Sequence, residues 1–230
     1  MALGTIDLTL YARLAKVFDV PGAGFAEEIA EVAAALDGTH PAAADAVRRL
    51  AALAPSDPTA RAELFLRTFD VQPITTLDLG YVLFGEDYKR GALLAGLSAE
   101  HTRAGNACGL ELGDHLPNVL RLLPRITDPE VREELVSVIV APAVRQMLQE
   151  FEPDRILAKE EVYRKHHKTI IEHAADETRT AYRHAFEALD HMLRADFRLA
   201  SAPPPEPITT FERRIDAEID LESGTSCSPA

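Results

Sequence analysis

The chain has 230 residues, with 37 Asp and Glu against 24 Lys and Arg, which gives a formal net charge of −13. A surface that binds phosphates needs a basic stripe, so this balance excludes nucleic acid as the main partner and disfavours docking to an anionic membrane. Hydrophobic residues make up 47% of the chain, which is enough for a packed core. Two cysteines, Cys108 and Cys227, are too few for a disulfide scaffold and fit a reducing cytosol.

The sequence also predicts no targeting segment. Residues 1–10 lack the basic region and the long apolar run of a signal peptide. No stretch approaches the roughly 18 apolar residues that a transmembrane helix needs. We therefore expect a cytoplasmic protein that does not insert into a membrane.

Helical periodicity dominates the first 70 residues. Apolar side chains at i, i+4, i+7 and i+8 place one buried face on residues 10–18, and a similar face recurs over residues 25–36. Prolines that follow polar residues predict two further helices, which begin at Pro41 and Pro58.

Residues 70–86 break this pattern with one proline and two glycines. Apolar residues alternate over 77–83, as they do in a strand, but a lone strand would have no partner. We therefore predict a loop followed by a short helix. Helical periodicity returns over residues 88–105, and a second irregular stretch, 106–113, precedes a helix that Asp114 is placed to cap.

The last third of the chain is charged and helical in composition. Asp128, directly before a proline, predicts another capped helix, and Pro142 is expected to bend the chain. A long helical region follows over residues 154–199 and ends before three consecutive prolines. Its clearest apolar stripe is Tyr182, Phe186, Leu189, Leu193 and Phe197. We expect a single all-α domain over residues 1–201 and an acidic, mostly disordered tail over residues 202–230 that contains one short helix.

Motifs of the common catalytic classes are absent. The glycine-bearing loops match neither G-x-G-x-x-G nor a P-loop, and the chain contains no G-x-S-x-G nucleophile elbow. Cys108 has no obvious histidine partner in sequence, so we interpret it as a small buried residue. These absences disfavour a nucleotide-binding enzyme and a serine hydrolase.

Histidines are concentrated near the end of the charged helical region. Several lie at helical spacing from one another or from glutamates, so a metal-binding helical bundle is one hypothesis. The Glu-x-x-His motif of di-iron bundles is absent, and a solvated charged helix is the alternative. The candidate ligands are His166, His173, Glu177, His184 and His191.

A polar pair, Asp114 and His115, follows the second irregular stretch and precedes an apolar helix. One interpretation is an ordinary N-cap next to a surface histidine. Another is a polar corner that receives a peptide, since a carboxylate pairs with arginine and a histidine donates or accepts beside it. A third is an acid–base enzyme that uses both side chains, although adjacent residues rarely orient for mutual proton transfer.

Three segments in register carry a family resemblance. The sequence resembles the molybdoenzyme-specific chaperones of the TorD/DmsD/NarJ superfamily, and within it the nitrate reductase delta-subunit branch, which serves type II enzymes of the DMSO reductase family. The resemblance covers about residues 8–155. Its three segments read ELFLRTFD at 63–70, LGYVLFGEDYKRG at 79–91 and ELGDHLP at 111–117.

The resemblance implies a cytoplasmic chaperone and not an enzyme. Such proteins bind the N-terminal, often twin-arginine, segment of the apo catalytic subunit of a molybdenum oxidoreductase. They hold it until the molybdenum bis-pterin guanine dinucleotide cofactor is inserted, before export or complex assembly. The chaperone itself keeps no stably bound cofactor, and it is a monomer or a dimer.

The resemblance also implies which residues bind the peptide. The Asp-His pair of the family corresponds to Asp114 and His115, and Leu116 and Pro117 follow it as in the family. Where the commoner motif has Glu-Pro-x, this chain has Glu-Leu-Gly, so Glu111 corresponds to the acidic position. A leader with arginines and an apolar stretch fits an apolar groove rimmed by carboxylates. Candidate groove residues are Phe69, Leu79, Tyr81, Phe84 and Tyr88; candidate rim residues are Glu86, Asp87, Glu111 and Asp114; Arg90 completes the predicted site.

The predicted tail contains a segment that resembles such a leader. Arg213 and Arg214 stand beside Phe211, Ile215 and Ile219, which recur at four-residue spacing. A chain whose own tail resembles its ligand is expected to bind peptide more tightly when that tail is removed.

Overall fold

The computed structural model describes residues 6–167, 176–197 and 199, and it confirms the all-α prediction. Over these residues the chain contains helices and no β-strand. Two extended segments touch through one isolated antiparallel bridge, between Asp78 and His115. None of the described helices is long and apolar enough to cross a membrane.

The N-terminal helices begin where the sequence predicts. Pro41 and Pro58 occupy the first turns of their helices, and the Asp57 carboxylate accepts a hydrogen bond from the Ala60 N–H at 2.8 Å. The elements are α1 (Thr9–Leu14), a 3₁₀ turn η1 (Ala15–Phe18), α2 (Phe25–Leu36), α3 (Pro41–Leu53) and α4 (Pro58–Phe69).

The middle of the chain follows the predicted order of loop, short helix, long helix and loop. α5 is the short helix and α6 the long one, and the second loop leads into α7. The Asp128 carboxylate caps α8 by accepting from the Glu130 N–H at 2.9 Å, as predicted. The elements are α5 (Leu79–Phe84), α6 (Tyr88–Arg103), α7 (Leu116–Leu122), a 3₁₀ turn η2 (Leu123–Arg125) and α8 (Pro129–Glu134).

Pro142 does not end the helical path. A π-helical segment, η3 (Leu135–Val140), joins α8 to α9 (Ala141–Gln149), and the backbone stays helical through both junctions. Proline has no N–H to continue the α-helical ladder, and a π segment is one way in which a helix absorbs such a break.

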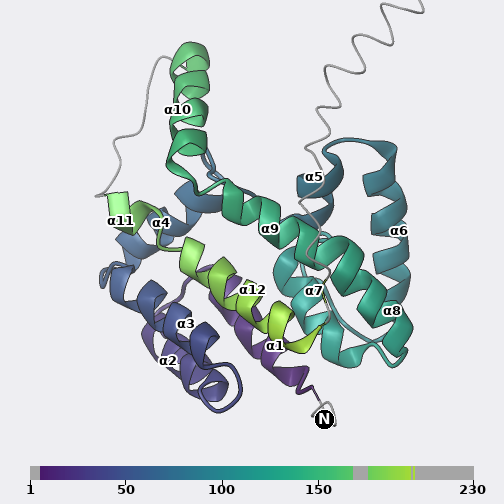
Figure 1. Ribbon diagram of the computed structural model, residues 1–230. Coiled ribbons are helices and arrows are strands. Elements are labelled where there is room, and N and C mark those ends of the chain that lie inside the picture. The colour runs from purple at the N-terminus through teal and green to yellow at the C-terminus, as the bar shows by residue number, and fades with distance from the viewer. Residues whose placement is uncertain (1–5, 168–175, 198, 200–230) are drawn as a thin grey trace, which may run out of the picture.

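The C-terminal helices complete the core. α10 (Pro153–His167) projects from the body in Figure 1, and α11 (Asp176–Arg179) precedes α12 (Arg183–Asp196), which packs against α3 and α9. The apolar stripe predicted from Tyr182 to Phe197 is buried. Phe186 lies at the centre of an aromatic cluster, with ring centroids 5.0 Å from Phe18, 5.8 Å from Phe151 and 6.1 Å from Phe69.

One carboxylate, that of Asp196, links three helices of this core. The Asp196 carboxylate accepts from the Tyr11 hydroxyl at 2.9 Å and lies 3.0 Å from Nε2 of His40, so it joins α1, α3 and the end of α12. Burial raises the pKa of Tyr11 far above its usual value, and the neighbouring Asp196 carboxylate raises it further. The tyrosine is therefore a neutral donor at any physiological pH.

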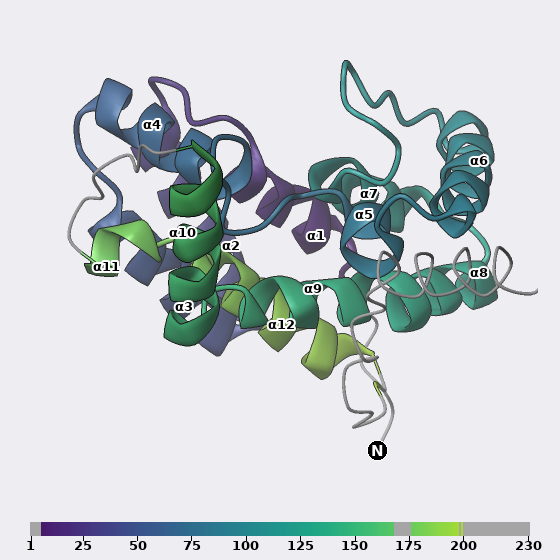
Figure 2. The ribbon, with the colours of Figure 1, turned by 90° about the horizontal axis from the view of Figure 1, so that it is seen from above.

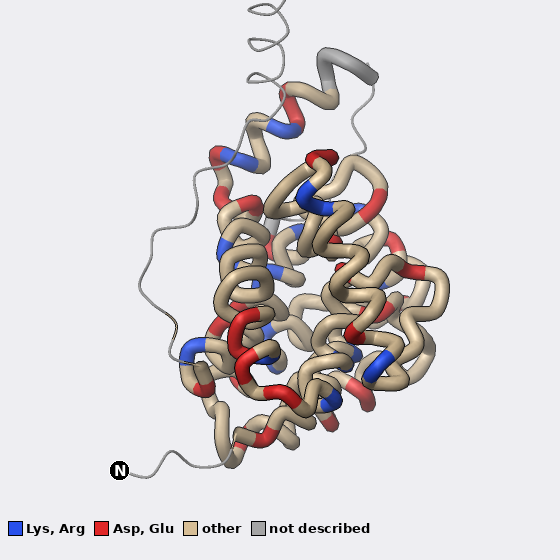
Figure 3. Tube along the Cα trace, turned by 90° about the vertical axis from the view of Figure 1, so that its right-hand side faces the viewer, with Lys and Arg blue, Asp and Glu red and all other residues tan. Residues whose placement is uncertain are grey.

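The charge of the described surface is mixed. On the side that Figure 3 shows, Lys and Arg are scattered among Asp and Glu along the helices. The predicted tail, the predicted domain end at residue 201 and His173 lie outside the described residues.

Candidate functional site

Two segments far apart in sequence meet at the start of α5. The Leu116 N–H donates to the Leu77 carbonyl at 2.8 Å, and the Leu79 N–H donates to the Asp114 carbonyl at 3.0 Å. This short antiparallel pairing places Asp78 beside His115. The alternation over residues 77–83 therefore reflects one bridge followed by a helix, and not a strand.

Asp114 caps a helix, but not the one that follows it. α7 begins after His115 without a side-chain cap, so the prediction that Asp114 caps this helix is wrong. Its carboxylate Oδ2 accepts instead from the Gly80 N–H, 3.2 Å away in the first turn of α5. Asp114 is 0% exposed, and its Oδ1 is buried without a partner in the described part of the chain.

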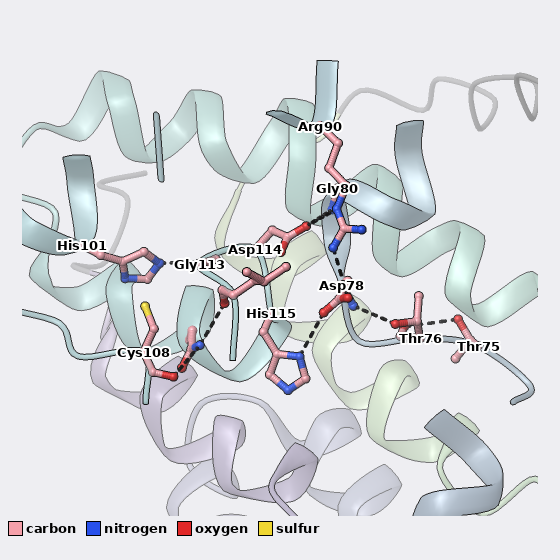
Figure 4. A network of polar contacts seen from close by, with 12 residues as sticks. Thr75, Thr76, Asp78, Gly80, Arg90, His101, Cys108, Gly113, Asp114 and His115 are labelled. Carbon is pink, nitrogen blue, oxygen red and sulfur yellow. Dashed lines mark hydrogen bonds and ion pairs between the residues drawn. The ribbon is translucent and has the colours of Figure 1, made fainter. Parts of the chain in front are cut away.

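Arg90 supplies the charge that this buried carboxylate needs. From the first turn of α6, its Nε donates to Asp114 Oδ2 at 3.1 Å and its second terminal nitrogen donates to Asp78 Oδ2, also at 3.1 Å (Figure 4). The guanidinium lies over the Tyr81 ring, 5.4 Å from its centroid. One arginine of α6 thus joins two carboxylates and an aromatic face from two other segments, residues 78–81 and the segment that contains Asp114.

His115 completes the network on the side of Asp78. Its Nδ1 lies 3.2 Å from Asp78 Oδ1 (Figure 4), while Asp114 points away toward Gly80 and Arg90. The hydrogen bond from His115 lowers the pKa of Asp78, and the charges of His115 and Arg90 add to this effect against the cost of burial. Because His115 pairs with Asp78, the geometry does not provide the Asp114–His115 pair of the acid–base hypothesis.

Gly80 is required by the same arrangement. A Cβ at this position would lie 2.7 Å from Asp114 Oδ2 and 3.1 Å from a side-chain carbon of Arg90. The cap on α5 therefore depends on a residue without a side chain.

The loop between α6 and α7 is held by buried amides. Figure 2 shows residues 104–115 as a long arch from the end of α6 to the start of α7. Asn118 Nδ2 donates to the carbonyls of Cys108 and Leu112, at 3.2 and 3.0 Å. Asn106 Nδ2 donates to Nδ1 of His101 at 2.9 Å, and Nε2 of this histidine donates to the Gly113 carbonyl at 2.9 Å.

An open pocket of about 540 Å³ lies beside this network. We call it the acidic pocket, because four of its lining residues are carboxylates and a single one is an arginine. It is bounded by the end of η1, the last turn of α4, residues 76–78 and the arch. Its lining residues are Phe18, Asp19, Val20, Phe65, Leu66, Phe69, Asp70, Thr76, Leu77, Asp78, Cys108, Glu111, His115, Pro117, Asn118 and Arg121.

The four carboxylates differ in what they contact. Asp19 pairs with Arg121, and Asp78 is held by the network. Asp70 and Glu111 are exposed, and neither carboxylate has a hydrogen-bond or ion-pair partner among the described residues. Two acceptors thus stay open at the mouth of the acidic pocket.

Two neighbouring cavities have less suitable chemistry. One of about 570 Å³ lies on the other side of the arch and has Glu111 as its one lining carboxylate. Another, of about 380 Å³, lies between α4 and α11, where Arg67 pairs with Glu63 and Arg179 pairs with Glu160. Neither offers two unpaired charges of one sign.

The predicted site residues do not form one surface. His115, Glu111, Pro117 and Phe69 line the acidic pocket, although Phe69 and Pro117 are largely buried. Leu79 and Leu116 are fully buried in the core, and Asp114 is buried too, so the predictions of Leu79 as a groove residue and Asp114 as a rim carboxylate are wrong.

The other predicted residues gather around α5 and the start of α6. Tyr88 is 77% exposed, Tyr81 and Glu86 are exposed, and Phe84 is half-buried. Asp87 caps α6 by accepting from the Lys89 N–H at 2.9 Å. Arg90 belongs to the buried network, so its structural role here is to hold two carboxylates.

The metal-binding hypothesis gains no support. Across the ranges that the structure describes, no three His, Cys, Asp or Glu side chains converge as ligands would. His184 contacts Glu187 at 2.7 Å, His191 and Glu177 are exposed, and His166 lies in the last turn of α10.

Sequence reasoning missed three carboxylates of the acidic pocket. Asp78 directly precedes the short helix and carries the signal of an N-cap residue, and Asp70 closes the first of the three segments. Asp19 follows the first apolar face directly. The available signal was that each of these three aspartates lies next to a helix end. Where helix ends converge in the fold, such residues come together.

No protein-family model matches the chain, and a comparison with curated proteins finds no match either.

Proposed function

We propose that the protein is a cytoplasmic, non-enzymatic assembly chaperone that binds the N-terminal segment of an apo molybdenum oxidoreductase subunit. The acidic pocket carries this proposal, because it combines apolar walls with two carboxylates that have no partner among the described residues. The resemblance of three sequence segments to the TorD/DmsD/NarJ superfamily supports the choice of ligand. We call the bound subunit the client and its N-terminal segment the leader.

The chemistry of the pocket fits a leader with adjacent arginines. A guanidinium donates two parallel hydrogen bonds to a carboxylate, and Asp70 and Glu111 offer one carboxylate to each arginine. Val20 and Leu66 are exposed at the same pocket and provide apolar surface for the residues that flank the arginines. The net charge of −13 adds long-range attraction for a basic peptide.

The buried network has a positioning role in this proposal. Arg90 and Asp114 fix the start of α5 against the arch, and Asp78 and His115 form the wall where these two segments meet. A wall held by charged contacts keeps the pocket open without a bound ligand, so less ordering is required when the leader binds.

The client, and not the chaperone, receives the molybdenum bis-pterin guanine dinucleotide cofactor. By holding the leader, the chaperone would keep the apo subunit from export or complex assembly until the cofactor is inserted. It acts on a protein partner, with neither nucleic acid nor membrane insertion involved, as a monomer or a dimer.

The test is a calorimetric titration of the full chain with the leader peptide of a molybdenum oxidoreductase catalytic subunit from the same organism. We expect saturable binding at one peptide per chain, with at least a tenfold loss when both arginines of the peptide are changed to alanine. This loss corresponds to the 1.4 kcal/mol or more that charge-assisted hydrogen bonds contribute. If neither the peptide nor the whole apo subunit binds, the proposal is wrong.

A further inference from the structure

The acidic pocket also matches a segment of the chain itself. It offers Asp70 and Glu111, two carboxylates without a partner in the described part of the chain, and exposed apolar residues beside them. Residues 209–219, TTFERRIDAEI, contain two adjacent arginines between a phenylalanine and an isoleucine. This is the same combination of charge and apolar side chains that the pocket fits.

We infer that residues 209–219 occupy the acidic pocket of their own chain and compete there with the client leader. The inference rests on the proposed function for the identity of the competitor, but the intramolecular contact can be tested without any client. Arg213 and Arg214 pair with Asp70 and Glu111, and Phe211 and Ile215 cover the apolar wall.

The chain is long enough for this contact. The Phe197 ring, at the end of α12, lies 6.1 Å from the Tyr11 ring in α1. Phe18 lies seven residues further along the same helical path, roughly 10 Å from Tyr11 at 1.5 Å per helical residue, and it lines the acidic pocket. Residues 200–212 can span up to about 43 Å when extended, well over this distance.

The tail segment is a weaker ligand than a leader without acidic residues. Glu212 and Asp216 flank the two arginines within two residues. Residues 202–230 contain six acidic residues in all, and the carboxylates of the pocket repel each of them. Because the segment is tethered, its effective concentration is on the order of 1 mM. A tail with a dissociation constant of about 100 µM would then weaken leader binding about tenfold, and a tighter client would still displace it.

Cys108 provides a direct probe of the contact, since it lines the acidic pocket. In the full chain carrying Cys227→Ser, the substitution Thr210→Cys places a second thiol beside the arginines. Under mild oxidation with oxidised glutathione we expect a disulfide within one chain, which migrates as a monomer. Burial raises the pKa of the Cys108 thiol, so the reaction is run at about pH 8.5 to form thiolate.

The matched control carries Arg213→Glu and Arg214→Glu in the same background. We expect the disulfide to form at least tenfold more slowly in this control. Equal rates would overturn the inference, because tethering alone would then explain the reaction. A disulfide that forms only between two chains would also overturn it.

The second measurement is the affinity of the full chain for the leader peptide. We expect Arg213→Glu with Arg214→Glu to raise this affinity about tenfold, as the effective-concentration argument requires. The opposite control, Glu212→Gln with Asp216→Asn, removes the repelled charges from the tail and should lower leader affinity. If neither double variant changes the affinity for the leader peptide, the inference is contradicted.

The outcomes separate the two proposals. If the leader binds but the Arg213 and Arg214 substitutions change neither disulfide formation nor affinity, the inference fails and the proposed function stands. If the arginine-dependent disulfide forms but no leader or apo subunit binds, the intramolecular contact stands and the proposed function fails.

Discussion

The core around α12 is stabilised differently from the corner, our name for the polar network of Asp78, Arg90, Asp114 and His115 at the start of α5. Around α12, Phe186 packs among aromatic rings at 5.0 to 6.1 Å, and the main polar contact is the one at Asp196. At the corner, a carboxylate with no exposure depends on one arginine and one backbone N–H. Apolar packing is spread over many contacts, whereas each charged group of the corner needs its particular partner.

This difference has a consequence for function. Closely packed apolar cores tolerate swaps of similar volume. A buried carboxylate does not tolerate the loss of its cation, because the remaining negative charge is then neither hydrated nor paired. The corner therefore defines the geometry of the acidic pocket more strictly than the core does, and substitutions that separate the two regions test this account.

The largest expected effect is at Arg90. Arg90→Met removes the cation beside buried Asp114 and should lower the free energy of unfolding by about 3–5 kcal/mol, measured by chemical denaturation. The double variant Arg90→Met/Asp114→Asn leaves no buried charge there and keeps an acceptor for the Gly80 N–H. This double variant should recover much of the unfolding free energy that Arg90→Met loses. A double variant as unstable as the sum of the single variants would contradict the charge argument.

Next in size is the effect at Gly80. A Cβ there would lie 2.7 Å from Asp114 Oδ2, so Gly80→Ala should cost about 1–3 kcal/mol of unfolding free energy. The matched control is Gly96→Ala within α6, where a Cβ meets nothing within 4 Å. This control should instead stabilise the protein by about 0.5–1 kcal/mol, as helix propensity predicts. Equal effects at both glycines would mean that the close approach at α5 is not essential.

The polar contact of the core should be worth less. Tyr11→Phe removes the hydroxyl that donates to Asp196 but keeps the ring and its contact with Phe197. We expect a loss of about 0.5–1.5 kcal/mol by thermal or chemical denaturation, since His40 still contacts the carboxylate. A loss as large as that of Arg90→Met would remove the distinction between the two regions.

The smallest expected effect concerns the acid response of the corner. His115 lowers the pKa of Asp78, so this carboxylate adds stability above its unfolded pKa of about 3.9. That stability is lost as the pH falls through the lower folded pKa. In His115→Ala the pKa of Asp78 should rise toward its usual value, as a carboxyl NMR titration would show. An unchanged value would contradict the proposed hydrogen bond.

The sequence predicts features that depend on neighbouring residues. Asp57 and Asp128 cap the helices that follow them, because the donors they need lie two or three residues away. The stripe from Tyr182 to Phe197 is predicted equally well, since a buried helical face follows from spacing alone.

The sequence does not predict which partner a polar residue finds across the fold. Asp114 has the sequence context of a local cap, yet its partner is Gly80, 34 residues away. The unpaired state of Asp70 and Glu111 also depends on how α4 and the arch meet. Tertiary contacts decide which carboxylates are buried and which stay exposed.

The most direct test of the central claim compares two pairs of carboxylates for leader binding. We expect Asp70→Asn/Glu111→Gln to weaken binding of the leader peptide at least tenfold, because the unpaired acceptors of the acidic pocket are lost. The control, Glu86→Gln/Asp87→Asn, removes the same charge beside exposed Tyr88 and should change affinity less than threefold, about 0.65 kcal/mol. If the control abolishes binding and the pocket variant does not, the acidic pocket is not the leader site.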